Sequence, residues 1–395
     1  MTSVIVAGAR TPMGRYQGAL SGLTAVQLGG HAIAAALARA GVAADEVDHV
    51  VMGNVVQAGN GQAPARQAAA LGGLGPSVPA TTINTVCLSG IDAVMAADRL
   101  IRLDEADIVV AGGMESMSRA PHLLAGSRGG MPFGPVTMMD ALEYDGLWDI
   151  RTGQSMGSLT DHANDEGERI SREEQDAFSA RSHRLAAAAR DAGVFADEIA
   201  PIDVSSRRQS VTVSADEGIR DDTSTETLAK LRSAFFPGGT ITAGSSSPLS
   251  DGGAALVIVR RELAEERGLP WIAEIGASGQ VAGPDSTLQH QPANAIRRAL
   301  GRDGTELDEV DLIEINEAFA VVGLSSVAKL GVDPDRVNVH GGAIALGHPL
   351  GMSGARLVLT LALSLERDGL ATGVAALCGG SGQGSALVLH GRSRS

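Results

Sequence analysis

Aromatic residues and cysteines are scarce in this sequence. Phe, Trp and Tyr make up 3% of its 395 residues and there are two cysteines, whereas glycine occurs 51 times. The core must therefore be packed mainly from Ala, Val, Leu and Ile, with close backbone approaches at glycine. Two cysteines in so long a chain argue against a disulfide framework. The nine histidines are scattered without the spacing of metal ligands, so we expect no metal site.

Basic residues and long hydrophobic runs are also lacking. The chain has 31 Lys and Arg against 46 Asp and Glu, which gives a formal net charge of −15. Such a charge argues against a general nucleic-acid binder, which needs a basic surface. No run of about 18 apolar residues is present, so we expect no membrane span. The opening MTSVIVAGAR has no basic stretch ahead of an apolar core, and we therefore expect a cytoplasmic protein.

The first 117 residues show alternating strand and helix patterns. For a chain of this length, two domains or one large duplicated domain is expected. The strands are expected at 4–7, 47–52, 80–84 and 107–111, and the helices at 23–40, 64–74 and 88–102. This order predicts an α/β fold with a largely parallel or mixed sheet.

The pattern changes between residues 118 and 250, a stretch too long for a simple surface loop. A charged helix is expected at 171–193, with Ser171 as N-cap and Glu174 completing a capping box. The alternation then returns, with strands at 254–259, 312–315, 337–339, 374–377 and 385–389 and helices at 292–300, 318–329 and 353–367. We interpret the chain as an N-terminal half (1–117 with 251–268), an inserted loop domain (118–250) and a C-terminal half (269–395).

A short internal echo supports two related halves. The tetrapeptide DEVD occurs at 45–48 and again at 308–311, each time after a helix and a glycine turn and before an apolar strand. Together with the matching order of elements, it predicts a duplication. A four-residue match can also arise by chance.

Cys87 lies in NTVCLSG (84–90), where a strand pattern gives way to an amphipathic helix pattern. A helix N-terminus presents unpaired N–H groups and the positive end of its dipole, which lowers the pKa of a thiol. We therefore expect a nucleophilic thiolate at this helix start. The alternative is a small, inert core residue, since free cysteines are often buried.

Three further clusters lie in the last eighty residues. His348 occupies a glycine-rich turn, GGAIALGHPLGMSG, ahead of a helix, a place that favours a functional role over a structural one. Cys378 lies at the end of a predicted strand and begins the sequence CGGSGQG. This sequence is equally consistent with an anion-binding turn and with a simple bend between two strands. Asn316, in NEAFA, either caps the next helix or holds a water or carbonyl oxygen. Two thiols, an imidazole and an amide at one edge of an α/β sheet are the functional groups that acyl transfer requires.

These residues resemble the thiolase family, most closely its bacterial acetyl-CoA C-acetyltransferases. The likeness covers nearly the whole chain and rests on many motifs in the right order. They are ARTPMGRYQG (9–18), GNVVQAGNGQAPARQAA (53–69), NTVCLSG (84–90), VAGGMESMS (110–118), EEQDAF (173–178), GTITAGSSSPLSDGGAA (239–255), EINEAFA (314–320), NVHGGAIALGHPLGMSGAR (338–356) and LCGGSGQG (377–384). The resemblance implies a duplicated, five-layered αβαβα thiolase fold whose inserted loop domain binds coenzyme A. It also implies a homotetramer in fatty acid metabolism, with acetyl-CoA, acetoacetyl-CoA and CoA as substrates and no cofactor.

The resemblance also assigns the catalytic residues. Cys87 matches the nucleophile that becomes acylated, and His348 matches the base that activates it. Cys378 matches the second cysteine, which moves a proton at the α-carbon of the second acyl-CoA. Asn316 matches the residue that, through a water and with His348, forms one oxyanion hole, while the N–H groups of Gly380 and Cys87 match the other.

The coenzyme A contacts follow by the same matching. Ser247 corresponds to a residue at the pantetheine, and Arg220 to one near the adenine and phosphates. For Arg220 the alternative is an ordinary solvent-exposed charge. The residues that match the lining of the tunnel are Met156, Ala243, Ala318 and Phe319.

The sequence departs from the family pattern around the acyl pocket. Ser155 stands where many biosynthetic members carry His, and SSSPL (245–249) and LQHQP (288–292) replace more frequent sequences. His340 stands where Asn also occurs and receives no catalytic role. The expected reaction is the reversible condensation of two acetyl-CoA to acetoacetyl-CoA and CoA, with a degradative 3-ketoacyl-CoA thiolase as alternative.

Two further functions remain as more distant alternatives. A carrier-protein-dependent ketoacyl synthase would lack the second cysteine, so Cys378 argues against it. A non-catalytic thiolase-like lipid carrier could lose catalytic residues, whereas all four are present here.

Overall fold

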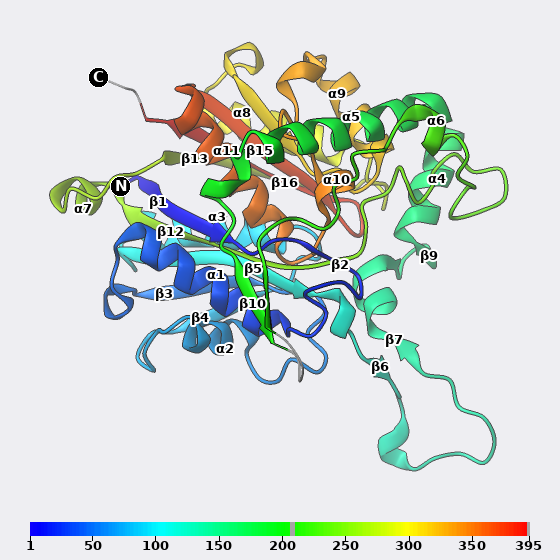
Figure 1. The fold of residues 1–395 in the computed structure, drawn as a ribbon, viewed down its shortest axis with the longest axis horizontal. Helices are drawn as coiled ribbons and strands as arrows, with labels where there is room; N and C mark the ends of the chain where they lie inside the picture. The colour runs from blue at the N-terminus through cyan, green and yellow to red at the C-terminus, as the bar shows by residue number, and fades with distance from the viewer. Residues whose placement is uncertain (206–209, 393–395) are drawn as a thin grey trace.

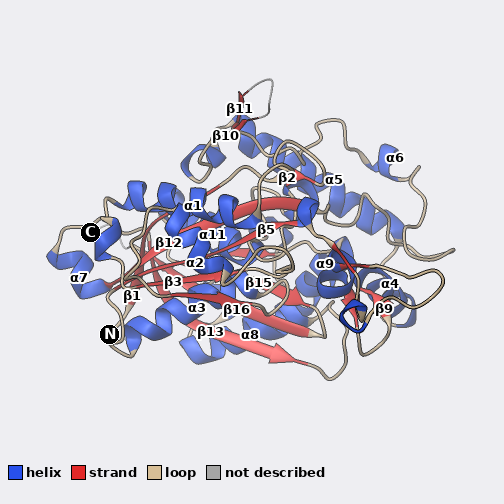
Figure 2. Ribbon diagram, turned by 90° about the horizontal axis from the view of Figure 1, so that it is seen from below, coloured by secondary structure: helices blue, strands red, loops and turns tan. Residues whose placement is uncertain are grey.

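The computed structural model describes residues 1–205 and 210–392, which form five stacked layers (Figures 1 and 2). One outer layer holds α1 (Ala25–Ala40) and α2 (Pro64–Leu71), and the other holds α8 (Gln291–Asp303) and α9 (Ala320–Leu330). Between the two sheets lie α3 (Ser89–Arg102) and α11 (Ser353–Asp368). Three apolar clusters fill the spaces between these layers, and the largest packs α3 and α11 against strands of both halves. The order of layers is thus αβαβα, as expected from the resemblance.

The strands of the two halves follow the same plan. Within the described residues the hydrogen-bonded order is β14-β15-β16-β13-β1-β12-β5-β3-β4, with β2 (Gly14–Arg15) beside β12. The strands of the first half are β1 (Ser3–Arg10), β3 (His49–Gly53), β4 (Ala80–Ile83), β5 (Ile108–Ser116) and β12 (Ser250–Arg260). The strands of the second half are β13 (Ala273–Ala282), β14 (Leu312–Ile315), β15 (Thr372–Gly379) and β16 (Gln383–Gly391). A short antiparallel pairing of β1 with β13 joins the two sheets.

The last aspartate of each DEVD sequence has the same structural role in both halves. In the first half, Asp48 Oδ2 accepts the N–H groups of Asp107 and Ile108, at 2.8 and 2.9 Å, where β5 begins. In the second half, Asp311 Oδ2 accepts two N–H groups at the start of β15, also at 2.8 and 2.9 Å. Each carboxylate therefore fixes the entry of an equivalent strand, which supports duplication over a chance match.

A second internal match lies in the middle layer, where VCLSG (86–90) and LGMSG (350–354) begin α3 and α11. The two helices cross at these starts. A Cβ added to Gly354 would lie 2.2 Å from the Ile91 nitrogen, and one added to Gly90 would lie 2.8 Å from the Ala355 nitrogen. Only glycine allows this approach. As a result, the loops that carry Cys87 and His348 meet at one place.

The segment between β5 and β12 covers the stretch interpreted above as an insertion. Its longer elements are α4 (Met156–Glu166), α5 (Arg172–Asp191) and the hairpin of β10 (Ile202–Ser205) with β11 (Ser210–Val213). Its short elements are β6 (His122–Leu123), β7 (Met139–Asp140), β8 (Trp148–Asp149), β9 (Gln154–Ser155) and α6 (Thr225–Leu228). The predicted capping box of Ser171 and Glu174 is confirmed at the start of α5.

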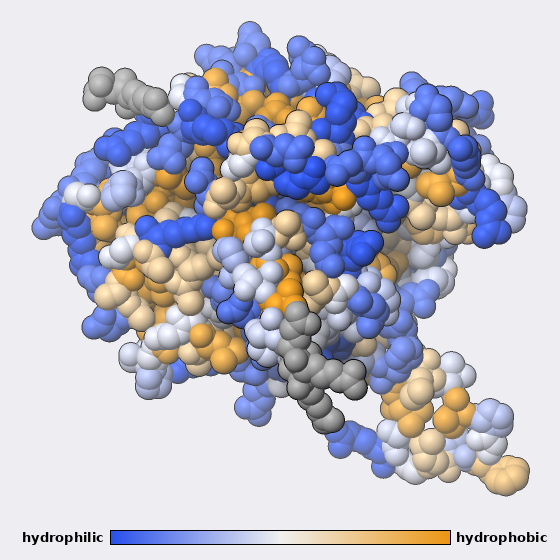
Figure 3. Space-filling model, viewed as in Figure 1, coloured by the Kyte–Doolittle hydropathy of each residue, from blue (hydrophilic) through white to orange (hydrophobic). Residues whose placement is uncertain are grey.

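An arm between β6 and β7 projects from the body of the protein (Figure 1). Apolar side chains gather along it (Figure 3). The exposed ones are Met131, Phe133, Val136 and Met138. Exposed apolar groups of this extent indicate an interaction site.

In the second half, one expected strand is wrong, one strand was not expected, and one helix begins later than expected. Residues 337–339 form no strand, because Asn338 has a φ of 50° and its side-chain amide bonds to both the N–H and the C=O of Ile315. This side chain replaces the backbone partner that a strand would provide. Strand β13 went unpredicted, since its sequence AEIGASGQVA mixes small and polar residues without a clear period. The helix expected at 318–329 begins two residues later, at Ala320.

Candidate active site

The turn that carries Cys87 is strained and tightly held. Val86 has a φ of 54°, which is unfavourable for a β-branched residue by about 1–3 kcal/mol. The turn persists because side chains bond to its backbone: Asn84 Oδ1 accepts the Val86 N–H at 3.0 Å, and Ser89 Oγ donates to the Val86 carbonyl at 2.6 Å. The Thr85 N–H donates to the same Ser89 oxygen at 3.0 Å. These bonds fix the direction of the Cys87 side chain.

The expected low pKa of Cys87 is not found. The backbone N–H groups of Cys87 and Gly380 bond to the thiol and favour its ionised form. Desolvation outweighs them and, with the nearby Glu115 carboxyl, raises the pKa of Cys87 to about 12. This shift is opposite in direction to the one expected from the helix start, because a sequence does not reveal which groups surround a thiol. The thiol must lose its proton during the attack on a substrate.

His348 is arranged to receive that proton. The Ser353 hydroxyl donates to the Pro349 carbonyl at 2.9 Å, so it can only accept from His348 Nδ1, which lies 2.6 Å away. The proton of the neutral ring is thus on Nδ1, and Nε2 keeps its lone pair. Burial, with the Arg356 charge, lowers the pKa of His348 to about 3. The imidazole is therefore neutral at physiological pH.

Asn316 lies next to His348 and does not cap a helix. Its Nδ2 is 3.4 Å from His348 Nε2, and its N–H donates to the Ala376 carbonyl at 3.0 Å. Helix α9 begins only at Ala320, which removes the capping interpretation. Asn316 Oδ1 is buried and accepts no hydrogen bond from the residues that the structure describes. The side chain can therefore still accept a hydrogen bond from water or a ligand.

Cys378 comes from the other half of the sheet and lies near Cys87. It is 2% exposed at the end of β15. Burial, together with the neighbouring Cys87, raises the pKa of its thiol. A positive φ at Ser381 and at Gly382 turns the chain directly into β16. This turn brings the Gly380 N–H against Cys87.

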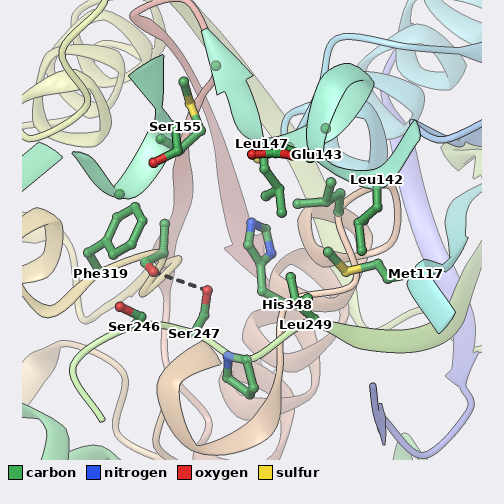
Figure 4. A pocket seen from close by; sticks show the side chains of 18 of the residues that line it. Met117, Leu142, Glu143, Leu147, Ser155, Ser246, Ser247, Leu249, Phe319 and His348 are labelled. Carbon is green, nitrogen blue, oxygen red and sulfur yellow. Dashed lines mark hydrogen bonds between the residues drawn. The ribbon is translucent and has the colours of Figure 1, made fainter. Parts of the chain in front are cut away.

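One cavity of about 660 Å³ brings the predicted residues together (Figure 4). All of them line it except Asn316, which contacts it through His348. The predicted lining residues are Cys87, His348, Cys378, Gly380, Met156, Arg220, Ala243, Ser247, Ala318 and Phe319. Ser247 fixes one wall, because its N–H and hydroxyl both donate to the Ala318 carbonyl, at 3.0 and 3.1 Å.

Part of the lining was not predicted. An apolar group packs around His348 and Cys87, and no periodicity in the sequence marks it (Figure 4). Its members are Met117, Leu142, Leu147, Leu249 and Leu350. Leu142–Leu147 is a π-helix, an irregular form that often occurs at functional sites. Ser353 was also missed, although the match between VCLSG and LGMSG points to it.

Comparisons with known proteins agree with this geometry. Residues 3–262 match the N-terminal domain of thiolase and residues 269–391 match its C-terminal domain. A probable acetyl-CoA acetyltransferase of Mycobacterium leprae is 57% identical over 98% of this chain and 99% of its own length. The probable acetyl-CoA acetyltransferase of Escherichia coli is 46% identical over 99% of both chains. The crystal structure of the Bacillus anthracis acetyl-CoA acetyltransferase superposes with a TM-score of 0.95 at 38% identity over 99% of both chains. With two domain models spanning nearly its whole length, this chain belongs to the thiolase family.

Proposed function

We propose that this protein is an acetyl-CoA acetyltransferase that condenses two acetyl-CoA to acetoacetyl-CoA and CoA, reversibly, through an acetylated Cys87. One observation carries the proposal: the thiols of Cys87 and Cys378 and the imidazole of His348 line the same cavity. The relatives named as probable acetyl-CoA acetyltransferases support the choice of acetyl-CoA as substrate.

In the first half-reaction, the Cys87 sulfur attacks the thioester carbonyl while its proton passes to His348 Nε2. The Cys87 and Gly380 N–H groups that contact the thiol are placed to bind the developing oxyanion. Collapse of this intermediate expels CoA, whose sulfur takes up the proton of Cys378, and leaves acetyl-Cys87, a Cys378 thiolate and a protonated His348. Concerted proton transfer is needed, because a thiol with a pKa of about 12 is neutral at rest.

In the second half-reaction, the Cys378 thiolate removes a proton from the α-carbon of the second acetyl-CoA. The raised pKa of Cys378 makes this thiolate a strong base once it forms, which suits a weakly acidic carbon. The enolate oxygen lies toward His348 and Asn316. The carbanion attacks acetyl-Cys87, the carbon–sulfur bond breaks, and the Cys87 sulfur takes back the proton held by His348, while Cys378 keeps the proton from the α-carbon.

The first test is the acyl-enzyme. Incubation with acetyl-CoA should add one acetyl group to the peptide that contains Cys87, detected by mass spectrometry, with release of one CoA. Cys87→Ser should abolish the modification and lower kcat by at least ~10³-fold, because it removes a group that acts as a unit with the base. Turnover that survives in Cys87→Ser would refute the mechanism.

A broader 3-ketoacyl-CoA thiolase is the second candidate, favoured by the apolar lining around His348. Met117, Leu142, Leu147 and Leu249 would accept an alkyl chain, and Ser155 leaves space where a larger side chain could stand. Thiolysis of 3-ketoacyl-CoAs of increasing length distinguishes the two. A steep fall in kcat/KM beyond four carbons supports acetyl-CoA specificity, whereas a flat profile supports the broader enzyme.

The projecting arm supports assembly into a homotetramer. Phe133 is fully exposed near its tip, beside the exposed Met131 and Met138. A second copy of the chain would bury these side chains, whose exposure is unfavourable in a monomer. Light scattering should give the mass of four chains, and Phe133→Glu should reduce it to a smaller species.

A further inference from the structure

Glu115 is a buried carboxylate that the mechanism above does not use. It lies next to the last residue of β5 and is 0% exposed. Its two oxygens accept four hydrogen bonds: from Asn54 Nδ2 at 2.9 Å and from the N–H groups of Val55, Val56 and Gly351 at 3.0, 3.2 and 3.0 Å. Among the described residues, no Lys, Arg or His forms an ion pair with it. A buried charge without a counter-ion is costly, so its retention needs a reason.

The bond to Gly351 connects the two halves of the protein beside the catalytic base. Gly351 follows His348 by three residues in the loop that begins α11. The same loop packs backbone to backbone on the first half, since a Cβ added to Gly113 or Gly53 would lie 1.8 or 2.7 Å from the Gly351 oxygen. Glycine contacts remove steric obstacles but supply no attraction of their own. The Glu115 carboxylate is a polar attachment that holds the loop at Gly351, and the Ser250 hydroxyl, which accepts the His348 N–H at 3.2 Å, is a second one.

The duplication identifies Glu115 as the counterpart of Cys378. In the first half Gly53 pairs with Gly113, two residues before Glu115, and in the second half Ile315 pairs with Ala376, two residues before Cys378. By the match of VCLSG with LGMSG, Gly351 is likewise the counterpart of Cys87. The backbone N–H that contacts the reacting thiol in one site thus binds a carboxylate in the other.

We propose that Glu115 is a positioning residue for acyl transfer: its ionised carboxylate anchors the Gly351 N–H and thereby sets the distance between His348 Nε2 and the Cys87 thiol. This inference rests on the proposed function, in which a proton passes between those two atoms. Proton transfer is sensitive to such distances, because donor and acceptor must come within hydrogen-bond reach.

The charge state of Glu115 supports the inference. Desolvation, with the facing Asp251 carboxyl on β12, raises the pKa of Glu115 to about 7, while the three backbone N–H groups oppose the rise. Cys87 also responds to the charge of Glu115, and its raised pKa keeps the thiol neutral in this range. Burial also raises the pKa of Asp251. His348, with a pKa of about 3, does not titrate in this range. We therefore expect activity to fall as pH drops through about 7, because a protonated carboxyl cannot accept all four bonds.

The main variant is Glu115→Gln. Its kcat for thiolysis of acetoacetyl-CoA should fall about 10–100-fold with KM within about twofold, and the acid limb near pH 7 should vanish. Alkylation of Cys87 by iodoacetamide, followed against pH, should be slowed by a similar factor, since it also requires loss of the thiol proton. The matched control is Glu198→Gln, which alters a buried carboxylate bonded to Arg10 and Thr360 outside the cavity. The control should lower Tm and leave the alkylation profile unchanged.

A second variant tests the inference even if Glu115→Gln folds poorly. Asn54→Ala leaves Glu115 with its three backbone donors, so the acid limb should move to higher pH while the rate at high pH stays within about threefold. Wild-type pH profiles in both variants, or equal losses in Glu115→Gln and Glu198→Gln, would overturn the inference. Absence of acetyl-Cys87 in the unmodified protein would instead overturn the proposed function.

Discussion

Asn54 and Asn316 follow equivalent strands of the two halves, β3 and β14, yet their surroundings differ. Asn316 lies against His348 with its oxygen free to accept a hydrogen bond, whereas Asn54 donates to Glu115 and to the Met114 carbonyl in a fully packed interior. The strands, the helix starts and the aspartates that bind the first N–H groups of β5 and β15 are alike in both halves. The comparison shows that the duplicated backbone forms the same arrangement of strand ends and helix starts twice. The thiols of Cys87 and Cys378 make one of these two arrangements reactive.

The largest expected effect separates the two asparagines. Asn316→Ala should lower kcat by about 10²–10³-fold with little change in stability, because it removes a donor at the reacting carbonyl. Asn54→Ala should chiefly reduce the free energy of unfolding, by about 1–3 kcal/mol, since it leaves the Glu115 carboxylate short of one bond. Steady-state thiolysis at high pH and urea unfolding measure both. Equal rate losses would mean that the two sites are functionally alike.

The next effect concerns stability against pH. Burial raises the pKa of Glu115 to about 7 and that of Glu314, beside Arg356, to about 8, from an ordinary 4.5. Each of these two carboxyls binds more protons in the folded state than in the unfolded state between its ordinary and its raised pKa, so its contribution to stability falls as pH rises from about 5 to about 8. The lowered pKa of His348 acts in the opposite direction, but only below about 6.5. For Glu115 alone the loss is about 3 kcal/mol. Urea unfolding at pH 5.5 and pH 8 tests this, and Glu115→Gln should reduce the difference.

Ser353 and Ser89 offer a smaller contrast at equivalent helix starts. Ser353→Ala removes the acceptor that keeps the His348 proton on Nδ1, so kcat should fall about tenfold while Tm changes little. Ser89→Ala releases the strained turn at Val86 instead, and should lower the unfolding free energy by about 1 kcal/mol. Kinetics and calorimetry on both variants distinguish these roles. A larger rate loss in Ser89→Ala would reverse the assignment.

The smallest effect should be the same in both halves. Asp48→Ala and Asp311→Ala each remove a carboxylate that accepts two N–H groups at a strand start. Each should lower the free energy of unfolding by about 1–2 kcal/mol, with kcat within about twofold. The double variant should be additive, because the two positions share no contact. Strong coupling between them would show that the halves are not independent at these points.

Much of the site could be predicted because its residues lie where strands end, a place that apolar runs and glycines mark in the sequence. Cys87, Asn316 and Cys378 met this condition, whereas His348 was identified from the glycine-rich turn ahead of α11. The pKa of Cys87 could not be predicted, since it depends on burial and on the Gly380 N–H and the Glu115 charge, which are remote in the chain. Ser353 and Glu115 were missed for a related reason: each acts on a neighbour that only the fold supplies.

The shared middle layer has a consequence for the protein's synthesis. Helix α3 packs against α11, and β5 pairs with β12, so the first half cannot bury its apolar surface until residues 250–368 have been made. During translation a long N-terminal segment must therefore leave the ribosome with its core incomplete. The native structure can form only when nearly the whole chain has emerged, and this interval is when the nascent protein most needs protection from aggregation.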